Sequence, residues 1–311
     1  MPQTFRTLAE YVKPLDLTPL HPHLTAIDFA SLPPHRYQQG VFGFYAIILK
    51  ENLGCGALQY GLGTYDYQAG TVLCVAPGQL FGPKDDGVKR QGKGKALLIH
   101  PAFLQGTPLA EAFSSATFFT YATREALHLS EDERGFFLEQ FHAIVQELSR
   151  LRDTHSEPIL RARLAVLLHL LTRFYERQFA SRTPENRAVL SRLETFLAST
   201  LPDSPEAPPQ ALPTVAACAK ALSLSPNYLG DLVRKETGSS AQAFIAHAIL
   251  SRAKTFLADT SASIAQISEV LGFSYPHHFT RFFRKYAGVP PRTIAPPANR
   301  RPAPSPPKAR A

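Results

Sequence analysis

Tryptophan is absent from this chain of 311 residues, which also has only one methionine and three cysteines. The scattered Cys55, Cys74 and Cys218 form neither a disulfide framework nor a CxxC metal or redox motif. No apolar run approaches the ~18 residues that a membrane helix needs, and the N-terminal segment lacks the pattern of a secretory signal. These absences indicate a cytoplasmic protein with reduced thiols and no membrane partner.

Acidic residues are scarce in the last third of the chain. Residues 211–311 contain 13 Lys and Arg but 4 Asp and Glu, whereas the first 210 residues contain 20 and 21. The net charge of +8 is therefore the sum of +9 in the last third and −1 in the rest. Such an asymmetry favours a polyanion partner for this third, most often nucleic acid. A solvated basic face without a partner is the alternative.

Residues 35–100 have the pattern of short β-strands. VFGFYAIILK (41–50), GALQYGLGTYDY (56–67), TVLCVAP (71–77) and KALLIHP (95–101) are rich in aromatic and branched residues. Short strands at this spacing predict a small antiparallel sandwich or barrel.

From about residue 130 the apolar positions recur every three or four residues, which is typical of helices. Ser130 and Glu133 form a possible capping box before the first helix. A longer helix with a broad apolar face follows Ser156, and a shorter one is expected over 185–198. An apolar face of that width usually has a partner, within the subunit or across a dimer.

Two proline-rich stretches interrupt the helical pattern. PDSPEAPPQALP (202–213) has five prolines in twelve residues, which favours an extended linker over a regular helix or strand. The end of the chain is also proline-rich and basic, and we expect it to be disordered. The predicted organisation is a β-rich domain over 1–128, a helical dimerisation segment over 129–200, a linker over 201–213, an all-α domain over 214–295 and a basic tail over 296–311.

Beyond the linker, a pattern of helix, tight turn and second helix occurs twice, about fifty residues apart. An amphipathic helix over 241–258 connects the two copies. The expected caps and turn residues are Thr214, Ser225, Gly238, Ser263, Gly272, Ser274 and Gly288. This arrangement predicts two helix-turn-helix units.

The last helix of the second unit combines an apolar side with a basic side. Its apolar residues, which can pack on Ile264, Ile267 and Leu271, are Phe279, Phe282, Phe283 and Tyr286. On the other side, Arg281 is placed to contact O6 and N7 of a guanine in the major groove. Arg284 and Lys285 lie nearer the helix end, where phosphates are the expected target. The alternative is a basic amphipathic helix that docks on a protein or a membrane.

The first helix-turn-helix is expected to recognise bases less well than the second. Its outward residues are Asn227, Tyr228, Gly230, Asp231, Arg234 and Lys235, and its inward ones Leu229, Leu232 and Val233. Asn227 can contact an adenine edge, whereas Gly230 offers no side chain. Asp231 either accepts from cytosine N4 or holds a neighbouring Lys or Arg within the domain.

Residues 213–294 resemble the double helix-turn-helix domain of AraC/XylS-type bacterial transcription regulators. The resemblance rests on LSPNYLGDLVRKETG (224–238), RAKTFLADT (252–260), SIAQISEVLGFSYPHHFTRFF (263–283) and RKYAGVPP (284–291). It implies that both recognition helices enter successive major-groove segments of double-stranded DNA. The base-contacting residues that it implies are Asn227, Gly230, Asp231, His277, His278, Thr280 and Arg281. The phosphate-contacting residues expected beside them are Ser225, Arg234, Lys235, Ser274, Tyr275, Arg284 and Lys285.

The chain departs from the family pattern at three positions. Ile249 and Ala295 stand where the family usually or often carries an arginine, and Ser223 replaces the common turn glycine of the first unit. These departures concern internal ion pairing and DNA affinity more than the fold.

In that family a cupin-like β-barrel that binds a small effector often precedes the DNA-binding domain, followed by helices for dimerisation. The order predicted here is similar, and GTYDYQAGTVLCVAPGQLFG (63–82) resembles the later barrel strands of such domains. The aromatic residues that can line an effector pocket are Phe42, Phe44, Tyr60, Tyr65 and Tyr67. Alternatively, these side chains only fill the barrel.

Catalytic motifs are missing. A metal site in a cupin needs several histidines and a carboxylate, but the pair His21 and His23 precedes the predicted strands, and His35 and His100 stand alone. No GxSxG motif occurs. We therefore expect no catalytic residues, no metal and no cofactor.

The sequence thus predicts an α+β, non-enzymatic transcription regulator that binds double-stranded DNA as a homodimer. A small effector in the N-terminal domain is expected to control it, and RNA polymerase is a further expected partner. Two alternatives stay open: an effector-independent DNA-binding dimer and a metal-dependent cupin enzyme.

Overall fold

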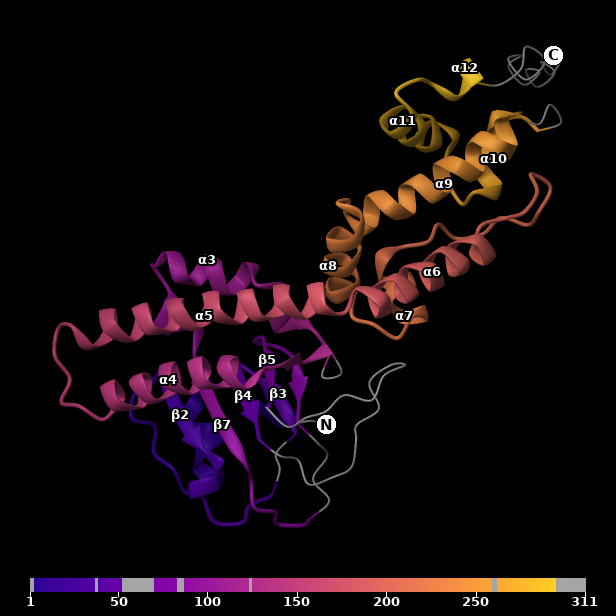
Figure 1. Cartoon of the computed structure of the whole chain (residues 1–311). Helices are drawn as coiled ribbons and strands as arrows, with labels where there is room; N and C mark the ends of the chain where they lie inside the picture. Colours follow the sequence, from indigo (N-terminus) through magenta and orange to yellow (C-terminus); the bar gives the residue numbers. More distant parts are fainter. Residues whose placement is uncertain are drawn as a thin grey trace, which may run out of the picture. The chain divides into compact units, whose positions relative to one another are not determined.

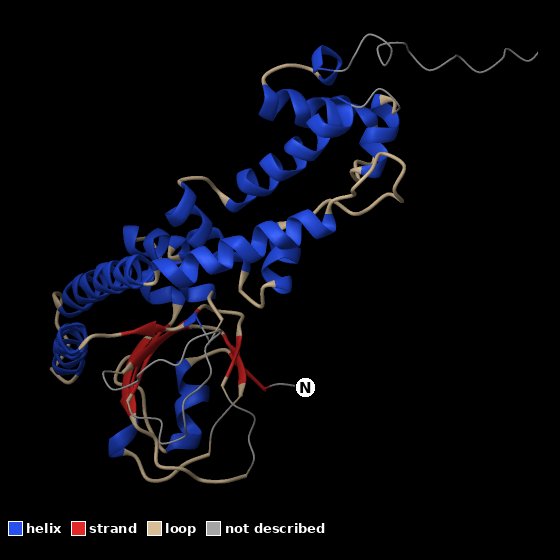
Figure 2. Cartoon of the chain, turned by 45° about the vertical axis from the view of Figure 1, so that its right-hand side comes forward, coloured by secondary structure: helices blue, strands red, loops and turns tan. Residues whose placement is uncertain are grey.

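The computed structural model describes residues 3–36, 39–51, 70–82, 87–122, 125–258 and 262–294. The chain divides into two compact units, Met1–Glu185 and Asn186–Ala311. All described strands belong to the first unit, and the described part of the second unit is helical (Figures 1 and 2). The predicted α+β class is confirmed.

The described strands of the first unit form a three-stranded sheet, β1-β3-β6, and a five-stranded sheet, β2-β7-β4-β5-β8. The strands are β1 (Gln3–Phe5), β2 (Leu24–Asp28), β3 (Gly40–Phe42), β4 (Tyr45–Lys50), β5 (Thr71–Val75), β6 (Leu80–Phe81), β7 (Gly94–Ile99) and β8 (Leu127–His128). All described pairs are antiparallel except β1 with β3, which is parallel.

The β structure differs from the expectation in two ways. It begins before residue 35, because β1 and β2 complete the sheets from the N-terminal segment. Among the described residues neither sheet is closed, so the expected cupin-like barrel is not confirmed. The predicted strand over 56–67 lies outside the described residues.

The five-stranded sheet is buried on both faces. Alternate residues of β4, such as Ile47 and Leu49, face a core shared with the long helices. Their neighbours Ala46 and Ile48 face a second core that contains Phe5 and residues of α1. The unbroken apolar runs of β4 and β7 follow from this double burial, since neither face meets water.

Helices pack on both faces of this sheet, α4 and α5 on one face and the short α1 on the other. The helices of the first unit are α1 (Leu8–Val12), α2 (Pro101–Leu104), α3 (Pro108–Ser115), α4 (Glu131–Leu148) and α5 (Ser156–Ser181). Three short 3-10 helices accompany them, over Lys13–Leu15, Phe29–Ser31 and Thr117–Thr120. The long α4 and α5 pack side by side (Figure 1). The expected capping box of Ser130 and Glu133 begins α4.

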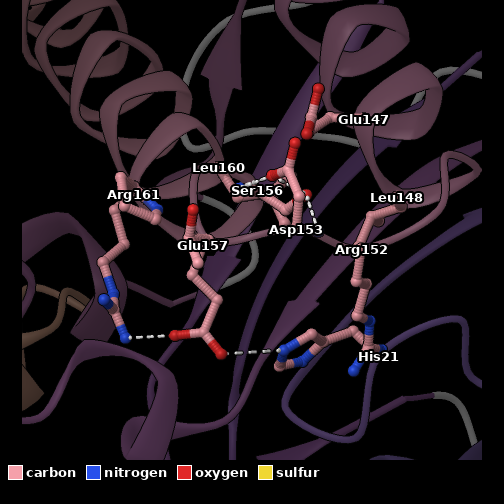
Figure 3. Close-up of a pocket in the computed structure, with 11 residues that line it drawn as sticks. His21, Glu147, Leu148, Arg152, Asp153, Ser156, Glu157, Leu160 and Arg161 are labelled. Atoms are coloured by element: carbon pink, nitrogen blue, oxygen red, sulfur yellow. Dashed lines mark hydrogen bonds and ion pairs between the residues drawn. The ribbon is translucent and has the colours of Figure 1, made fainter.

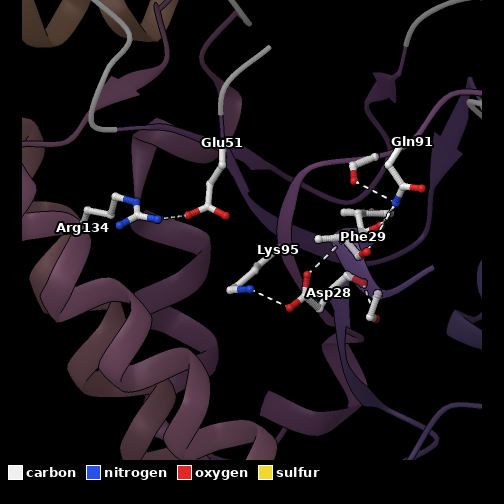
Figure 4. A network of polar contacts seen from close by, with 9 residues as sticks. Asp28, Phe29, Glu51, Gln91, Lys95 and Arg134 are labelled. Carbon is white, nitrogen blue, oxygen red and sulfur yellow. Dashed lines mark hydrogen bonds and ion pairs between the residues drawn. The ribbon is translucent and has the colours of Figure 1, made fainter. Parts of the chain in front are cut away.

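Ion pairs tie the strands to one another and to the helices (Figure 4). Lys95 of β7 binds Asp28 at the end of β2 with a separation of 2.7 Å. Arg134 of α4 pairs with Glu51, which directly follows β4. Since β4 and β7 are neighbours, these pairs hold one end of the sheet and α4 in a fixed arrangement.

The short strand β8 is held between the sheet and α5. Gln178 of α5 accepts a hydrogen bond from the backbone N–H of His128 (2.8 Å) and donates one to the carbonyl of Ala126 (3.1 Å). On the other side, His128 Nδ1 lies 3.3 Å from the hydroxyl of Thr71 in β5. Burial, with Arg182 and Arg177 nearby, lowers the pKa of His128 to about 4.

The helices of the second unit are α6 (Thr183–Thr200), α7 (Val215–Ala221), α8 (Pro226–Thr237), α9 (Ala241–Ala258), α10 (Ile264–Val270), α11 (Pro276–Ala287) and α12 (Pro291–Ile294). The connecting helix α9 has the predicted bounds and serves two cores. Ile245 and Ile249 belong to the core of α7 and α8. Leu250 and Phe256 belong to the core of α10 and α11.

The proline-rich stretch 202–213 packs on this unit. Leu212 contacts the first of the two cores and Ala207 contacts the second. The backbone N–H of Gln210 donates to the carbonyl of Val270 (3.4 Å). α6 also buries Leu193 in the first core, and the boundary between the compact units, after Glu185, lies in the first turn of α6. A linker had been expected at 201–213.

Lowering the pH should destabilise the first unit through His128. As the pH falls below 6.5, the unfolded chain binds a proton that the folded chain takes up only near pH 4. Stability should therefore fall by up to about 3 kcal/mol between these values and then stop responding to this group. Urea unfolding of His128→Gln should show a smaller loss from pH 7 to 4.5. The same change at the exposed His142 is the control; equal pH dependence in the two variants would contradict the assignment.

Gly272 should not tolerate a side chain. Its φ is +88°, and a Cβ there would lie 2.1 Å from the carbonyl oxygen of Gln210. Gly288 also has a left-handed φ, +77°, but has no atom within 4 Å of that position. We expect Gly288→Ala to cost about 1 kcal/mol and Gly272→Ala about 3 kcal/mol or more. Thermal unfolding of both variants measures the difference; equal costs would mean that 202–213 does not pack on the turn.

Candidate nucleic-acid interface

The second unit contains two helix-turn-helix motifs of the same backbone geometry, α7–α8 and α10–α11. The turn residues Ser223 and Gly272 are both left-handed, with φ of +60° and +88°. In each motif the residue after the turn residue donates back to the first helix: Leu224 to Ala219 (2.8 Å) and Phe273 to Ser268 (3.0 Å). The predicted tandem motif is therefore present.

Three of the four predicted serine and threonine caps are confirmed. Thr214, Ser225 and Ser263 accept hydrogen bonds from backbone N–H groups in the first turns of α7, α8 and α10. The prediction for Ser274 is wrong, because the residue before Pro276 is Tyr275, which makes no side-chain cap. The second motif has one more residue between its turn and its second helix, and this insertion displaces the serine.

The two recognition helices correspond residue by residue at a spacing of fifty, since α8 begins at Pro226 and α11 at Pro276. Both end at the predicted left-handed glycines, Gly238 and Gly288. Both carry Arg-Lys in the last turn: Arg234 and Lys235 in α8, Arg284 and Lys285 in α11. The helices differ at their centres, where Gly230 and Asp231 correspond to Thr280 and Arg281.

The solvent face of α11 is polar and basic. Phe279 and Phe283 are fully buried in the core with Ile267 and Leu271, as predicted. The opposite face forms a shallow hollow lined by His277, Thr280, Arg281, Arg284 and Lys285. Within the described ranges none of its three cations has an ion-pair partner. This face therefore presents charge that a polyanion can neutralise.

Two side chains at the start of α11 are oriented by their neighbours. The hydroxyl of Thr280 donates to the carbonyl of Pro276 (3.0 Å). Tyr275 is 58% exposed and stacks on the ring of His277, with centroids 5.4 Å apart. His278 lies beside His277 at 4.3 Å, and both histidines are exposed, as is Ser274.

The corresponding face of α8 is less open. Asn227, Arg234 and Lys235 are exposed, but Gly230 and Asp231 are half-buried, and so is the cap Ser225. The prediction that Tyr228 faces outward is wrong, since this residue is 7% exposed. A tyrosine ring at a helix edge gains stability by burying its apolar area. Only part of the predicted outward face of α8 is therefore exposed.

The candidate effector residues that the structure describes lie in a packed core. Phe42 and Phe44 are buried, and their rings stack with centroids 5.1 Å apart. Tyr11 contacts both rings, and burial raises its pKa to about 12. This packing favours the interpretation that the two phenylalanines fill the core. Tyr60, Tyr65 and Tyr67 lie outside the described residues.

The histidines of the first unit have structural contacts. Nδ1 of His21 accepts from the N–H of His23 (3.0 Å), and Nδ1 of His100 accepts from that of Ala102 (3.2 Å). His23 stacks on His100, and His35 pairs with Arg90 in a β-bridge. Among the described residues no three His, Cys, Asp or Glu side chains are placed to share a metal ion. None of the described helices has both the length and the apolar character to cross a membrane.

The structure describes two of the three positions at which the chain departs from the family pattern. Ile249 is 5% exposed and fills the core between α7, α8 and α9, so an apolar contact stands where the family pattern has an arginine. Ser223 adopts the left-handed backbone that the usual glycine would favour. Ala295 lies outside the described residues.

Comparison with known proteins identifies the same region. Residues 218–295 match the family described as "Helix-turn-helix domain". Over 67 residues the chain is 40% identical to the "Uncharacterized HTH-type transcriptional regulator YobQ" of Bacillus subtilis, which is 22% of this chain and 28% of that protein. Over 73 residues it is 37% identical to the "Msm operon regulatory protein" of Streptococcus mutans. This match covers 24% of this chain and 26% of that protein. The chain thus matches about a quarter of the length of these two relatives.

A solved structure described as a transcriptional regulator with an AraC-type DNA-binding domain, from Chromobacterium violaceum, is similar with a TM-score of 0.28 and 24% identity. The similarity covers 37% of this chain and 92% of that one. The family match and the two named relatives confirm that the predicted helix-turn-helix domain is present in the last third of the chain.

Proposed function

We propose that this protein is a transcription regulator that binds a specific sequence of double-stranded DNA through both helix-turn-helix motifs. The observation that carries the proposal is the pair of matching recognition helices, each with an exposed Arg-Lys pair at its end. These cations suit phosphates on either side of a major groove. The excess of positive charge in residues 211–311 supports the same partner.

We expect the two recognition helices to contribute unequally to base recognition. In α11, Arg281 is an exposed cation with no carboxylate partner among the described residues, and it suits the O6 and N7 atoms of guanine. In α8 the corresponding Asp231 is half-buried and repels phosphates. We infer that α11 recognises bases, while α8 contributes phosphate contacts and a base contact from Asn227.

The first unit would act as the sensor. An effector that prefers one arrangement of this unit changes the affinity for DNA by the difference between its affinities for the two arrangements. Self-association would use the α4–α5 surface, where Phe136 and Val166 are 52% and 45% exposed; sedimentation of the full chain decides this point. The rival function, a DNA-binding dimer without an effector, predicts the same operator but no response to any small molecule.

Selection of binding sites from random DNA by the full chain, at near-physiological salt, tests the proposal. Two recognition helices in successive major-groove segments should yield two short sequence blocks about one helical turn apart. The block under α11 should be the better defined. Binding with a steep salt dependence and no recovered motif would contradict sequence-specific recognition, because phosphate contacts alone produce that behaviour.

Arg281→Ala should weaken binding to the selected site by ~1–3 kcal/mol and relax the preference at one base pair. Arg192→Ala removes the same charge from an exposed position of α6 in the same unit and is the matched control. Gel-shift titrations against the selected site and single-base variants measure both effects. If Arg281→Ala binds every sequence as tightly as the wild type does, α11 is not a base-recognition helix.

Thr280 should recognise the methyl group of a thymine. Its hydroxyl hydrogen is used by Pro276, so the hydroxyl oxygen can only accept, and the methyl group can contact the methyl of a thymine. Replacing the contacted thymine by uracil should weaken wild-type binding about fourfold, the effect of ~0.8 kcal/mol per buried methyl. Thr280→Val keeps the methyl and should keep this sensitivity, whereas Thr280→Ser should lose it. A Ser variant that still distinguishes thymine from uracil would contradict the assignment.

A further inference from the structure

A cavity with charged walls lies in the first unit where the chain passes from α4 to α5 (Figure 3). Its volume is about 390 Å³, within the range of roughly 300–1,000 Å³ that is typical of small-molecule sites. The last turn of α4, the loop after it, the first turns of α5 and His21 before β2 form the walls. Leu148 and Leu160 add buried apolar surface.

The arginines of this cavity already bind protein groups. Nε of Arg161 donates to the carbonyl of Phe103 (3.0 Å), and Nη2 pairs with Glu157 (2.8 Å). Nη2 of Arg152 donates to the carbonyl of Leu20 (2.5 Å). These contacts orient both arginines, and the carboxylate of Glu157 already offsets part of the charge of Arg161.

The histidine of the cavity is neutral. Nδ1 of His21 accepts a backbone hydrogen bond from His23, so the ring proton is assigned to Nε2, which lies 3.6 Å from Glu157. Burial lowers the pKa of His21, and the nearby Arg152 lowers it further, against the opposing effect of Glu157. The charges of the lining are therefore two arginines against three carboxylates, those of Glu147, Asp153 and Glu157.

Glu147 is the carboxylate of this lining that accepts no hydrogen bond from the described residues. Its side chain is 10% exposed, and among the described residues its one ion pair is with Arg150 of the same helix turn, at 4.0 Å. That distance is too long for a hydrogen bond, and Arg150 is itself 73% exposed. By contrast, Asp153 accepts from two backbone N–H groups and a hydroxyl. The carboxylate of Glu147 is therefore available to accept a hydrogen bond from a ligand donor.

We propose that this cavity binds a small organic cation, with a primary ammonium or guanidinium group on a short apolar body. The cationic group donates to Glu147 and is attracted by the excess negative charge of the walls. The apolar body packs against Leu148 and Leu160. Cation binding is a property of the first unit alone; a change in DNA affinity on binding is a further step that rests on the proposed function.

Titration calorimetry of the full chain without DNA tests the proposal. The probes are n-butylammonium and agmatine, with butyrate and n-butanol as controls of similar size. We expect saturable 1:1 binding of the two cations and none of the controls. Glu147→Gln should weaken binding about 10- to 100-fold, the effect of one hydrogen bond between charged groups. Glu139→Gln, at an exposed position of the same helix, should leave binding unchanged.

A second variant covers the case in which Glu147→Gln does not fold. Thr154 is exposed at the edge of the cavity, and Thr154→Lys supplies a tethered ammonium group that should compete with the probes. The proposal is overturned if neither cation binds folded protein at about 10 mM, if butyrate binds as well as butylammonium, or if both variants bind like the wild type. DNA binding measured on the same samples is independent of these outcomes.

Discussion

Burial of apolar side chains against α9 is the constraint on which the second unit depends. This one helix supplies Ile245 and Ile249 to the core under α8, and Leu250 and Phe256 to the core under α11. Each fully buried side chain of this size stabilises the fold by roughly 1.5–3 kcal/mol. Because α9 is a single rigid rod, the two recognition helices keep a fixed relation within the unit. That relation determines which groove segments they can enter together.

The same packing explains why a chain can hold so many cations on α11 without acids beside them. Phe279 and Phe283 hold the helix by its apolar face, so its stability does not require ion pairs on the other face. Left without carboxylate partners among the described residues, Arg281, Arg284 and Lys285 keep their full charge for a ligand. The corresponding helix α8 has Gly230 and the acid Asp231 at the positions of Thr280 and Arg281, and these differences make the two faces unequal.

Much of the second unit could be predicted because its signals are local. Caps such as Ser225, and left-handed glycines such as Gly238, act within one turn of the chain. Ser274 was misassigned because a one-residue insertion moves it away from the proline that begins α11. The burial of Tyr228 and the packing of 202–213 on Val270 depend on contacts distant in the sequence, which periodicity does not report. For the same reason β1 and β2, short strands paired with distant partners, were missed.

The cavity in the first unit had no signal in the sequence at all, because its walls come from His21 and from a helix-helix junction over a hundred residues later. Its position nevertheless suits a sensor. Glu157 and Arg161 belong to the first turns of α5, a helix of 26 residues that ends at Ser181. Gln178, near that end, holds β8. A rigid helix transmits a displacement of its first turn to its last. A ligand that contacts Glu157 can therefore shift α5 relative to the sheet of the first unit only as far as it binds one position of α5 more tightly than another.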